Sequence, residues 1–230
     1  PYTTLFRSAA SGKPPALETP LVAGADRTAI LLSESAAKAE LSTFGMRVPK
    51  QAKDFASGTA LTETFAVKGT GFAHKSEAGA VALNVTHLEL AEVVKNMPGD
   101  GVLIEEMITG AVAEMLLGVV RDPAHGFVLT VGAGGILTEI MKDTVSFIVP
   151  TSADDIRALL PSLKSYPLLT GFRGKSAANI DDLINAIMAL QSYVVAHADR
   201  IEEVEINPIM CTPTAAIAAD ALIRIAPERT

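Results

Sequence analysis

The spacing of apolar and polar positions predicts both helices and strands in this chain. The clearest helical signal follows Asp181 and Asp182, where apolar residues recur every three or four positions and cover one wide face. Shorter helices are expected over 33–44, 88–96 and 152–161, and the first and last of these open on a serine that can cap a helix.

Short apolar runs between turn signals predict strands. Neighbouring runs are separated by tight turns more often than by long helical crossovers, which favours an α+β fold over a regular βαβ array. Pro208 is expected to end one strand, because proline lacks the N–H that a ladder needs. The predicted strands are 65–68, 79–85, 102–106, 113–120, 127–131, 203–207 and 215–222.

Composition narrows the class of protein. The 230 residues are 49% hydrophobic, enough for a well-buried core in one large domain or two small ones. The net charge of −7 argues against nucleic acid or an anionic membrane as the main partner. The single cysteine, Cys211, cannot form an internal disulfide or a cysteine-based zinc site, so a cytoplasmic location is expected. The longest Gly-rich uncharged stretch, 126–138, is shorter than the roughly 20 residues of a membrane-spanning helix.

The N-terminal residues have a different character from the rest. Residues 1–8 lack the apolar core of a secretory signal, and residues 9–27 carry three prolines and several small residues without periodicity. We therefore interpret 1–27 as an extraneous N-terminus followed by an interdomain linker, and exclude it from the fold.

The last two predicted strands carry a candidate metal site. Period-two alternation places Glu205 and Asn207 on one face of their strand, and a hairpin-like return would bring Asp220 close to Asn207. Such an all-oxygen site suits Mg²⁺, which takes few protein ligands and completes its shell with water and phosphate. An amphipathic edge strand with a solvated acidic face is the alternative, and spacing alone favours it.

A lysine at the end of a strand is the second candidate feature. Lys68 ends the apolar run 65–68, and the Gly-rich segment that follows contains Lys75 and Ser76. Ammonium, hydroxyl and backbone N–H groups together can bind phosphate oxygens. The spacing of a P-loop is absent, and a surface turn with a polar tip explains the segment slightly better when it is taken alone.

Two further features are ambiguous by themselves. Glu106 and Glu114 lie eight positions apart, at the end of one strand and the start of the next, where they could flank an adenine and a ribose. Exposed strand-end acids are the simpler explanation. The glycines of 132–135 form either an anion-binding nest or a sharp turn that needs positive φ.

The order of these features resembles a known family. The chain is similar to the ATP-grasp part of the ADP-forming acyl-CoA synthetases, relatives of the succinyl-CoA synthetase β subunit, over roughly residues 29–225. The segments that carry the resemblance are Lys68, HKSEAG at 74–79, VLIEEM at 102–107, GVVRDP at 118–123, GAGGILTEIMKD at 132–143, GFRG at 171–174 and EVEINPI at 203–209.

The resemblance implies an ATP-grasp fold in which two α/β lobes clamp a nucleotide. The small lobe would span 28–104 and the large lobe 105–226. ATP or ADP and Mg²⁺ are the implied ligands. Lys68 would contact the phosphates, Glu106 and Thr109 would lie at the adenine, Glu114 would bind the ribose, and Asn207 and Asp220 would hold Mg²⁺ with Glu205 beside them.

The resemblance also implies a reaction and partners. It places His74 where ADP-forming acetyl-CoA synthetases carry a second phosphohistidine, in an acid–thiol ligase that forms acyl-CoA, ADP and phosphate. A neutral imidazole can take up a phosphoryl group and so divide the transfer into easier steps. CoA would be bound by a domain or subunit outside these residues, and a small organic acid is the second substrate. The chain alone is expected to be inactive as a ligase.

Departures from the family pattern leave an alternative open. Phe147 stands where the family often has arginine, and Ala80 stands where glycine is usual. A non-catalytic regulatory module, as in some protein lysine acetyltransferases, is the alternative. Catalysis is favoured over it by the retained residues His74, Lys68, Asn207 and Asp220. A ligase that joins a carboxylate to an amine is disfavoured by the HKSEAG segment.

Overall fold

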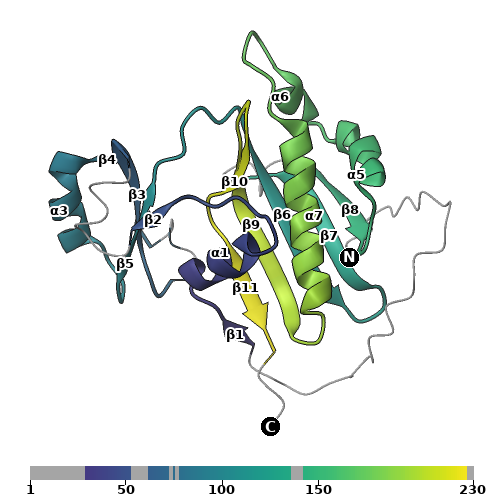
Figure 1. Cartoon of the computed structure of the whole chain (residues 1–230), viewed down its shortest axis with the longest axis horizontal. Helices are drawn as coiled ribbons and strands as arrows, with labels where there is room; N and C mark the ends of the chain where they lie inside the picture. The colour runs from purple at the N-terminus through teal and green to yellow at the C-terminus, as the bar shows by residue number, and fades with distance from the viewer. Residues whose placement is uncertain (1–28, 53–61, 73–74, 76–77, 136–141, 227–230) are drawn as a thin grey trace.

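Two β-sheets lying side by side make up the molecule (Figure 1). The computed structural model describes residues 29–52, 62–72, 75, 78–135 and 142–226. Within them, one sheet has seven strands in the order β1-β11-β9-β6-β7-β8, with β10 paired to β9, and the other has four in the order β2-β5-β3-β4. The mixture of helices and antiparallel sheets agrees with the expected α+β class.

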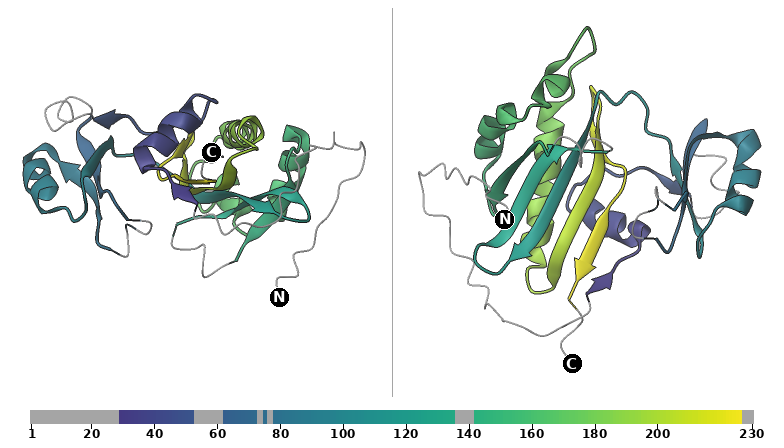
Figure 2. Two further views of the ribbon diagram at one scale, coloured as in Figure 1. Left: turned by 90° about the horizontal axis from the view of Figure 1, so that it is seen from below. Right: turned by 180° about the vertical axis from the view of Figure 1, so that it is seen from behind.

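The seven-stranded sheet is covered by helices on one face. Alternate residues of β6 are fully or almost fully buried, because period-two alternation turns Met115, Leu117 and Val119 toward α7 (Ile180–Ala196). Among the described residues, no helix lies on the opposite face of this sheet (Figure 2). The other strands are β1 (Ile30–Leu31), β7 (Gly126–Ala133), β8 (Thr144–Ile148), β9 (Ile201–Cys211), β10 (Ala216–Ala218) and β11 (Leu222–Ile225).

Helix α7 forms where the apolar periodicity predicts it. The Asn179 side chain caps its N-terminus by accepting from the backbone N–H of Asp182, and Asp181 and Asp182 occupy its first turn, where the helix dipole favours acids. Its buried face completes the main core. No helix of the described residues is both long and apolar enough to cross a membrane. Shorter helices flank it: α5 (Ala153–Leu159), the 3₁₀ turn η1 (Leu160–Ser162) and α6 (Tyr166–Thr170).

The four-stranded sheet has a small core of its own. Its strands are β2 (Gln51–Ala52), β3 (Thr64–Gly69), β4 (Val81–Thr86) and β5 (Val102–Glu106), and α3 (His87–Asn96) packs on one face. The core consists of Phe65, Val67, Val85, Leu90 and Ile104.

Helix α1 (Glu34–Ser42) lies between the two sheets but packs on the larger one (Figure 2). Ala37 and Leu41 are fully buried in the main core, and β1 pairs with β11 of the seven-stranded sheet. The lobe boundary expected from the sequence, 28–104 against 105–226, therefore differs from the structure in its first segment. The apolar face of α1 contributes to the larger core because that core extends to the edge strand β11.

The chain also departs from the expected strands near its end. Strand β9 does not stop at Pro208 but continues to Cys211. The pairing of β9 with β6 shifts register here, so that two residues of β9 lie opposite one of β6, and proline is tolerated in such a bulge. The expected strand 215–222 is two strands, β10 and β11, and β8 was not expected at all.

Candidate nucleotide-binding site

Six charged side chains meet between the two sheets, and we call them the lysine–carboxylate cluster. Their charges balance, three against three. Burial removes most of them from water, since Lys38 and Glu105 are 0% exposed and Lys68 is 6% exposed. The members come from α1, β3, β5, the segment after β3 and the link between β10 and β11: Glu34, Lys38, Lys68, Lys75, Glu105 and Asp220.

Regular structure brings four of these groups together: Glu34, Lys38, Lys68 and Glu105. The four-residue spacing of Glu34 and Lys38 puts both on one face of α1, with Lys38 Nζ 2.7 Å from Glu34 Oε1. Lys68 is paired in the ladder with Leu103, two positions before Glu105, so Lys68 and Glu105 project from the same face of the small sheet. Their side chains meet at 2.8 Å, Nζ to Oε2.

Lys38 and Lys68 share their acceptors. Lys68 Nζ lies 2.7 Å from Glu34 Oε1, 2.8 Å from Glu105 Oε2 and 2.6 Å from the carbonyl oxygen of Ala219. Lys38 Nζ lies 2.7 Å from the same Glu34 oxygen, 2.6 and 2.8 Å from the two Glu105 oxygens and 2.6 Å from the same Ala219 carbonyl. The four-stranded and seven-stranded sheets are therefore joined through one buried network.

Lys75 extends the network to the candidate metal ligand. Its Nζ lies 2.9 Å from Glu34 Oε2, and 2.9 and 3.0 Å from the two carboxylate oxygens of Asp220. Lys75 thus links the cluster to the end of the large sheet. His74 and Ser76, on either side of it, lie outside the described residues.

The network shifts the acid–base properties of its members. Burial opposes ionisation of Glu34, but three nearby ammonium groups overcome it and lower its pKa to about 2. Burial and then the neighbouring Lys68 lower the pKa of Lys38. Although burial opposes it, the charges of Glu34 and Glu105 raise the pKa of Lys68. Burial, followed by repulsion from Glu34, raises the pKa of Asp220.

The candidate metal ligands converge beside this cluster. Leu222 pairs with Glu205, and the N–H of Ala219 donates to the carbonyl of Pro208 at 3.0 Å, so the antiparallel register places Asp220 across from Asn207. Asn207 Nδ2 in turn lies 3.3 Å from Glu205 Oε1. Among the described residues no group of three or more acidic, histidine or cysteine side chains is arranged to hold a metal.

The glycine turn and Glu114 meet at the same place. The backbone N–H of Gly135 donates to Asn207 Oδ1 at 2.9 Å, and Gly135 has a φ of +59°, which favours glycine. A Cβ at Gly135 would lie 2.0 Å from Glu114 Oε2. The structure therefore brings three separately noted features, the glycine turn, Glu114 and Asn207, to one rim of the large sheet.

The remaining predicted nucleotide ligands, Glu106 and Thr109, lie at the end of β5 and on the link that follows it. Glu106 points away from the cluster because it alternates with Glu105, and its Oε1 accepts from the N–H of Lys50 at 3.0 Å. Thr109 is exposed on the link between β5 and β6. Phe147, which stands where the family often has arginine, is buried in the main core.

Comparison with known proteins identifies the fold. A family model described as an ATP-grasp domain matches residues 25–225. The chain belongs to the ATP-grasp domain family. The β subunit of acetate–CoA ligase [ADP-forming] I from Pyrococcus furiosus is 30% identical over 210 residues, which cover 83% of this chain and 90% of that one. This confirms the expected resemblance to the ADP-forming acyl-CoA synthetases.

Other relatives of this ATP-grasp chain are also named as CoA ligases or acetyl-coenzyme A synthetases. Acetate–CoA ligase [ADP-forming] I from Archaeoglobus fulgidus is 28% identical over 182 residues, 74% of this chain but only 26% of that longer one. Among solved structures, the dinucleotide-forming acetyl-coenzyme A synthetase 1 of Ca. Korarchaeum cryptofilum, in complex with coenzyme A, Ca-AMPCP and HgCl⁺, has a TM-score of 0.76 at 25% identity. The match covers 86% of this chain and 93% of that one.

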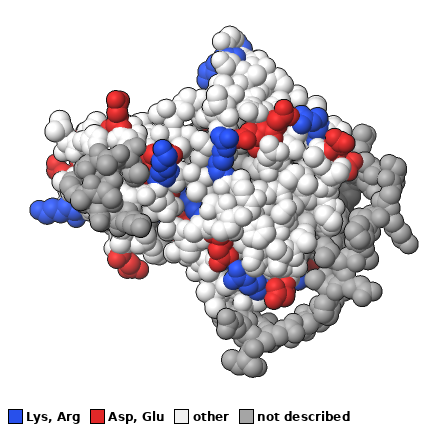
Figure 3. All heavy atoms as spheres, viewed as in Figure 1, with Lys and Arg blue, Asp and Glu red and all other residues white. Residues whose placement is uncertain are grey.

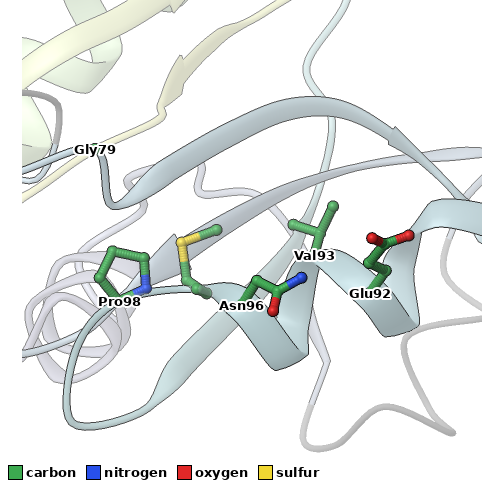
Figure 4. Close-up of a pocket in the computed structure, with 6 residues that line it drawn as sticks. Gly79, Glu92, Val93, Asn96 and Pro98 are labelled. Carbon is green, nitrogen blue, oxygen red and sulfur yellow. The ribbon is translucent and has the colours of Figure 1, made fainter.

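Two hollows in the described part of the surface lie at α3 and β4, away from the lysine–carboxylate cluster. One of about 310 Å³ is lined by residues of α3 and its flanks, including Glu92, Val93, Asn96 and Pro98 (Figure 4). It offers no basic group to a phosphate. On the face shown in Figure 3, positive and negative side chains of the described residues are interspersed without a large patch of one sign.

Three members of the cluster were not predicted from the sequence as site residues: Glu34, Lys38 and Glu105. The first two form an ordinary four-residue helix pair, a spacing that is usually solvent-exposed. Glu105 sits in an apolar strand beside Glu106, and the alternation that turns the two side chains to opposite faces, one buried and one half-buried, was the available signal.

Proposed function

We propose that this chain is the nucleotide-binding, phosphoryl-transferring part of an ADP-forming acid–CoA ligase, which converts acid, CoA and ATP to acyl-CoA, ADP and phosphate. The observation that carries the proposal is Lys68, a buried ammonium between two sheets and close to Asp220. The relatives named as ADP-forming acetate–CoA ligases support it.

Lys68 and Lys75 are the proposed phosphate ligands. Each is an ammonium held near the seam between the lobes, 8% and 11% exposed at the side chain, where low dielectric strengthens its attraction for a phosphate. As charge moves between phosphoryl oxygens during transfer, these two groups stabilise it. Ser76 is proposed to add a hydroxyl donor.

The residues at the end of the large sheet fit Mg²⁺. Asn207, Asp220 and Glu205 supply oxygen donors only, and Mg²⁺ characteristically takes one or two carboxylates together with substrate phosphates. When bound, the ion would neutralise charge on the phosphates. The Asn207 carboxamide is already oriented by the N–H of Gly135, and the Asp220 carboxylate is held by Lys75.

The connection between the lobes is the proposed nucleoside site. Glu106 and Thr109 lie on or beside it, where backbone groups can hydrogen-bond the edge of an adenine. Glu114, at the start of β6 and next to the glycine turn, is placed to accept from ribose hydroxyls. The phosphates would then extend toward Lys68.

His74 is the proposed phosphoryl acceptor. A neutral imidazole nitrogen attacks the γ-phosphorus, the new N–P bond forms as the bond to the β,γ-bridging oxygen breaks, and ADP departs with that oxygen. The phosphoryl group then passes to a partner that binds CoA and a small organic acid. Since one relative bears the name of a β subunit, a separate subunit is the proposed partner.

Labelling with γ-³²P-ATP and Mg²⁺ tests this function. We expect label that is labile in acid and stable in base, as a phosphoramidate is, and its loss in His74→Asn. Lys68→Met should also lose it, through weaker binding. Absence of label while calorimetry still detects bound nucleotide would instead indicate a non-catalytic, regulatory ATP-grasp module.

A further inference from the structure

Two lysines of the cluster, Lys38 and Lys68, contact the same acceptors. Lys38 and Lys68 both contact Glu34 Oε1, Glu105 Oε2 and the carbonyl oxygen of Ala219, all within 2.8 Å. Two ammonium groups that share three acceptors repel each other strongly at low dielectric. Each of these three acceptors therefore faces two ammonium groups.

Lys68 has no donor to spare in this arrangement. An ammonium carries three N–H donors, and those of Lys68 have three protein acceptors. It can bind a phosphate only by releasing at least one of them. A buried carboxylate that loses its counter-ion is strongly destabilised, so release would be costly if Lys68 were the only partner.

Lys38 keeps the carboxylates of Glu34 and Glu105 paired, so the release of Lys68 leaves neither without a counter-ion. It touches every acceptor that Lys68 touches and both oxygens of Glu105, so each acceptor keeps a donor when Lys68 leaves. Lys38 is also 0% exposed, on the rigid helix α1, and is therefore confined to the interior of the cluster. The departure of Lys68 would in addition relieve the repulsion between the two ammonium groups.

We propose that Lys38 is a positioning residue for nucleotide binding. By holding the carboxylates of Glu34 and Glu105 permanently, it frees Lys68 to turn to the nucleotide phosphates. It acts through Lys68 and does not itself contact the nucleotide. This inference rests on the proposed function, because it presumes that Lys68 is a phosphate ligand.

A pair of substitutions distinguishes this role from simple structural support. Lys38→Met keeps the length of the side chain and removes its charge, which leaves Lys68 as the main counter-ion of Glu105. We expect the dissociation constant of the Mg²⁺ complex of ADP to rise by at least about tenfold, measured by titration calorimetry on the whole chain. Lys95→Met, an exposed lysine on α3, is the matched control and should leave the constant unchanged.

Adding Glu105→Gln to Lys38→Met provides the decisive measurement. It removes the carboxylate that holds Lys68, so affinity should recover to within about threefold of the unsubstituted chain, even though a second buried group has been altered. A structural role for Lys38 predicts the opposite, a further loss. Circular dichroism melts establish that each variant is folded.

The outcomes separate the two proposals. If the unsubstituted chain fails to bind the nucleotide, the proposed function is wrong and this inference falls with it. If it binds and Lys38→Met binds equally well, only the inference is overturned. Should Lys38→Met fail to fold, Glu105→Gln is compared with the double variant: equal affinities are expected, and a tenfold difference between them would contradict the inference.

Discussion

The contacts of individual residues explain how six charged side chains can be buried in the lysine–carboxylate cluster. A carboxylate or an ammonium taken out of water is destabilised by several kcal/mol unless hydrogen bonds and opposite charges replace its solvent. In this domain every carboxylate of the cluster contacts at least one lysine, and Glu34 contacts three: Lys38, Lys68 and Lys75. The arrangement leaves the cluster electrically neutral.

The first prediction concerns Lys68. We expect Lys68→Met to raise the dissociation constant for Mg-ATP by roughly 30-fold or more, because a charge-assisted contact to phosphate is worth about 2 kcal/mol. The fold should survive, since Lys38 contacts the same acceptors. Calorimetry gives the affinity and thermal melts give the stability. An unchanged dissociation constant would remove Lys68 from the phosphate site.

The second prediction is the dependence of stability on pH. Glu34 has its pKa lowered from 4.5 to about 2, so it releases its proton more readily in the folded chain than in the unfolded one. Its contribution, on the order of 3 kcal/mol, is therefore complete above pH 4.5 and is lost as the pH falls from about 4.5 to 2. Urea denaturation at several pH values measures this loss.

Two variants isolate the Glu34 contribution. In Glu34→Gln the free energy of unfolding should fall less steeply over that pH range than in the unsubstituted chain, although it starts lower at neutral pH. Glu92→Gln, an exposed position on α3, should follow the unsubstituted chain. Identical pH profiles for the unsubstituted chain and Glu34→Gln would show that Glu34 is not held ionised by the lysines.

Sequence analysis found Lys68 and Asp220 but missed Lys38. Lys68 is conspicuous as a charge that ends an apolar strand, and Asp220 was found because a hairpin-like return of the chain would bring it close to Asn207. Lys38 follows Glu34 by one helical turn, a pattern that solvated helices also show. Its burial depends on the approach of β5 and of the link after β10, which are 67 and 181 residues away along the chain.

At the scale of elements, the interruption between β10 and β11 matters most. A continuous strand over 215–222, as the sequence predicts, would pair the backbone of Ala219 within the ladder. The interruption instead directs the carbonyl of Ala219 to two lysines and leaves the side chain of Asp220 to Lys75. The sequence does carry a signal for the break, because Ala219 and Asp220 are residue types that strands disfavour.

The third prediction tests the packing of the glycine turn on β6. A Cβ at Gly134 would lie 2.5 Å from the carbonyl carbon and oxygen of Met115, and backbone atoms cannot move aside as a side chain can. Gly134→Ala should therefore destabilise the fold by about 2 kcal/mol. It should also weaken nucleotide binding, because the adjacent Gly135 orients Asn207.

Gly118→Ala is the matched control for the turn. Gly118 lies in the same strand pair, has no positive φ, and a Cβ there would meet nothing within 4 Å. Its melting temperature should stay close to that of the unsubstituted chain. Equal melting temperatures for the two variants would show that the turn does not pack against β6 as described.

At the scale of the whole molecule, two sheets with separate cores enclose one charged seam. The sequence predicts most strands of each sheet because alternation and turn signals are local. It does not predict that α1 joins the larger core, since the apolar face formed by Ala37 and Leu41 would fit either sheet. The family resemblance, by contrast, singled out Lys68, as a residue that would contact the nucleotide phosphates.

The final prediction concerns the molecule and its partner. The proposed reaction needs a nucleotide site, a phosphoryl acceptor and a site for CoA, and Lys68 and Asp220 are proposed to belong to the first of these. Purified alone, the chain should bind Mg-ATP and form no acyl-CoA from acetate and CoA. Addition of a CoA-binding subunit should start thioester formation, followed as hydroxamate, and Lys68→Met should abolish it. If the isolated chain formed thioester, these residues would themselves bind CoA and form acyl-CoA. That result would contradict the proposal that this chain binds the nucleotide and a separate subunit binds CoA.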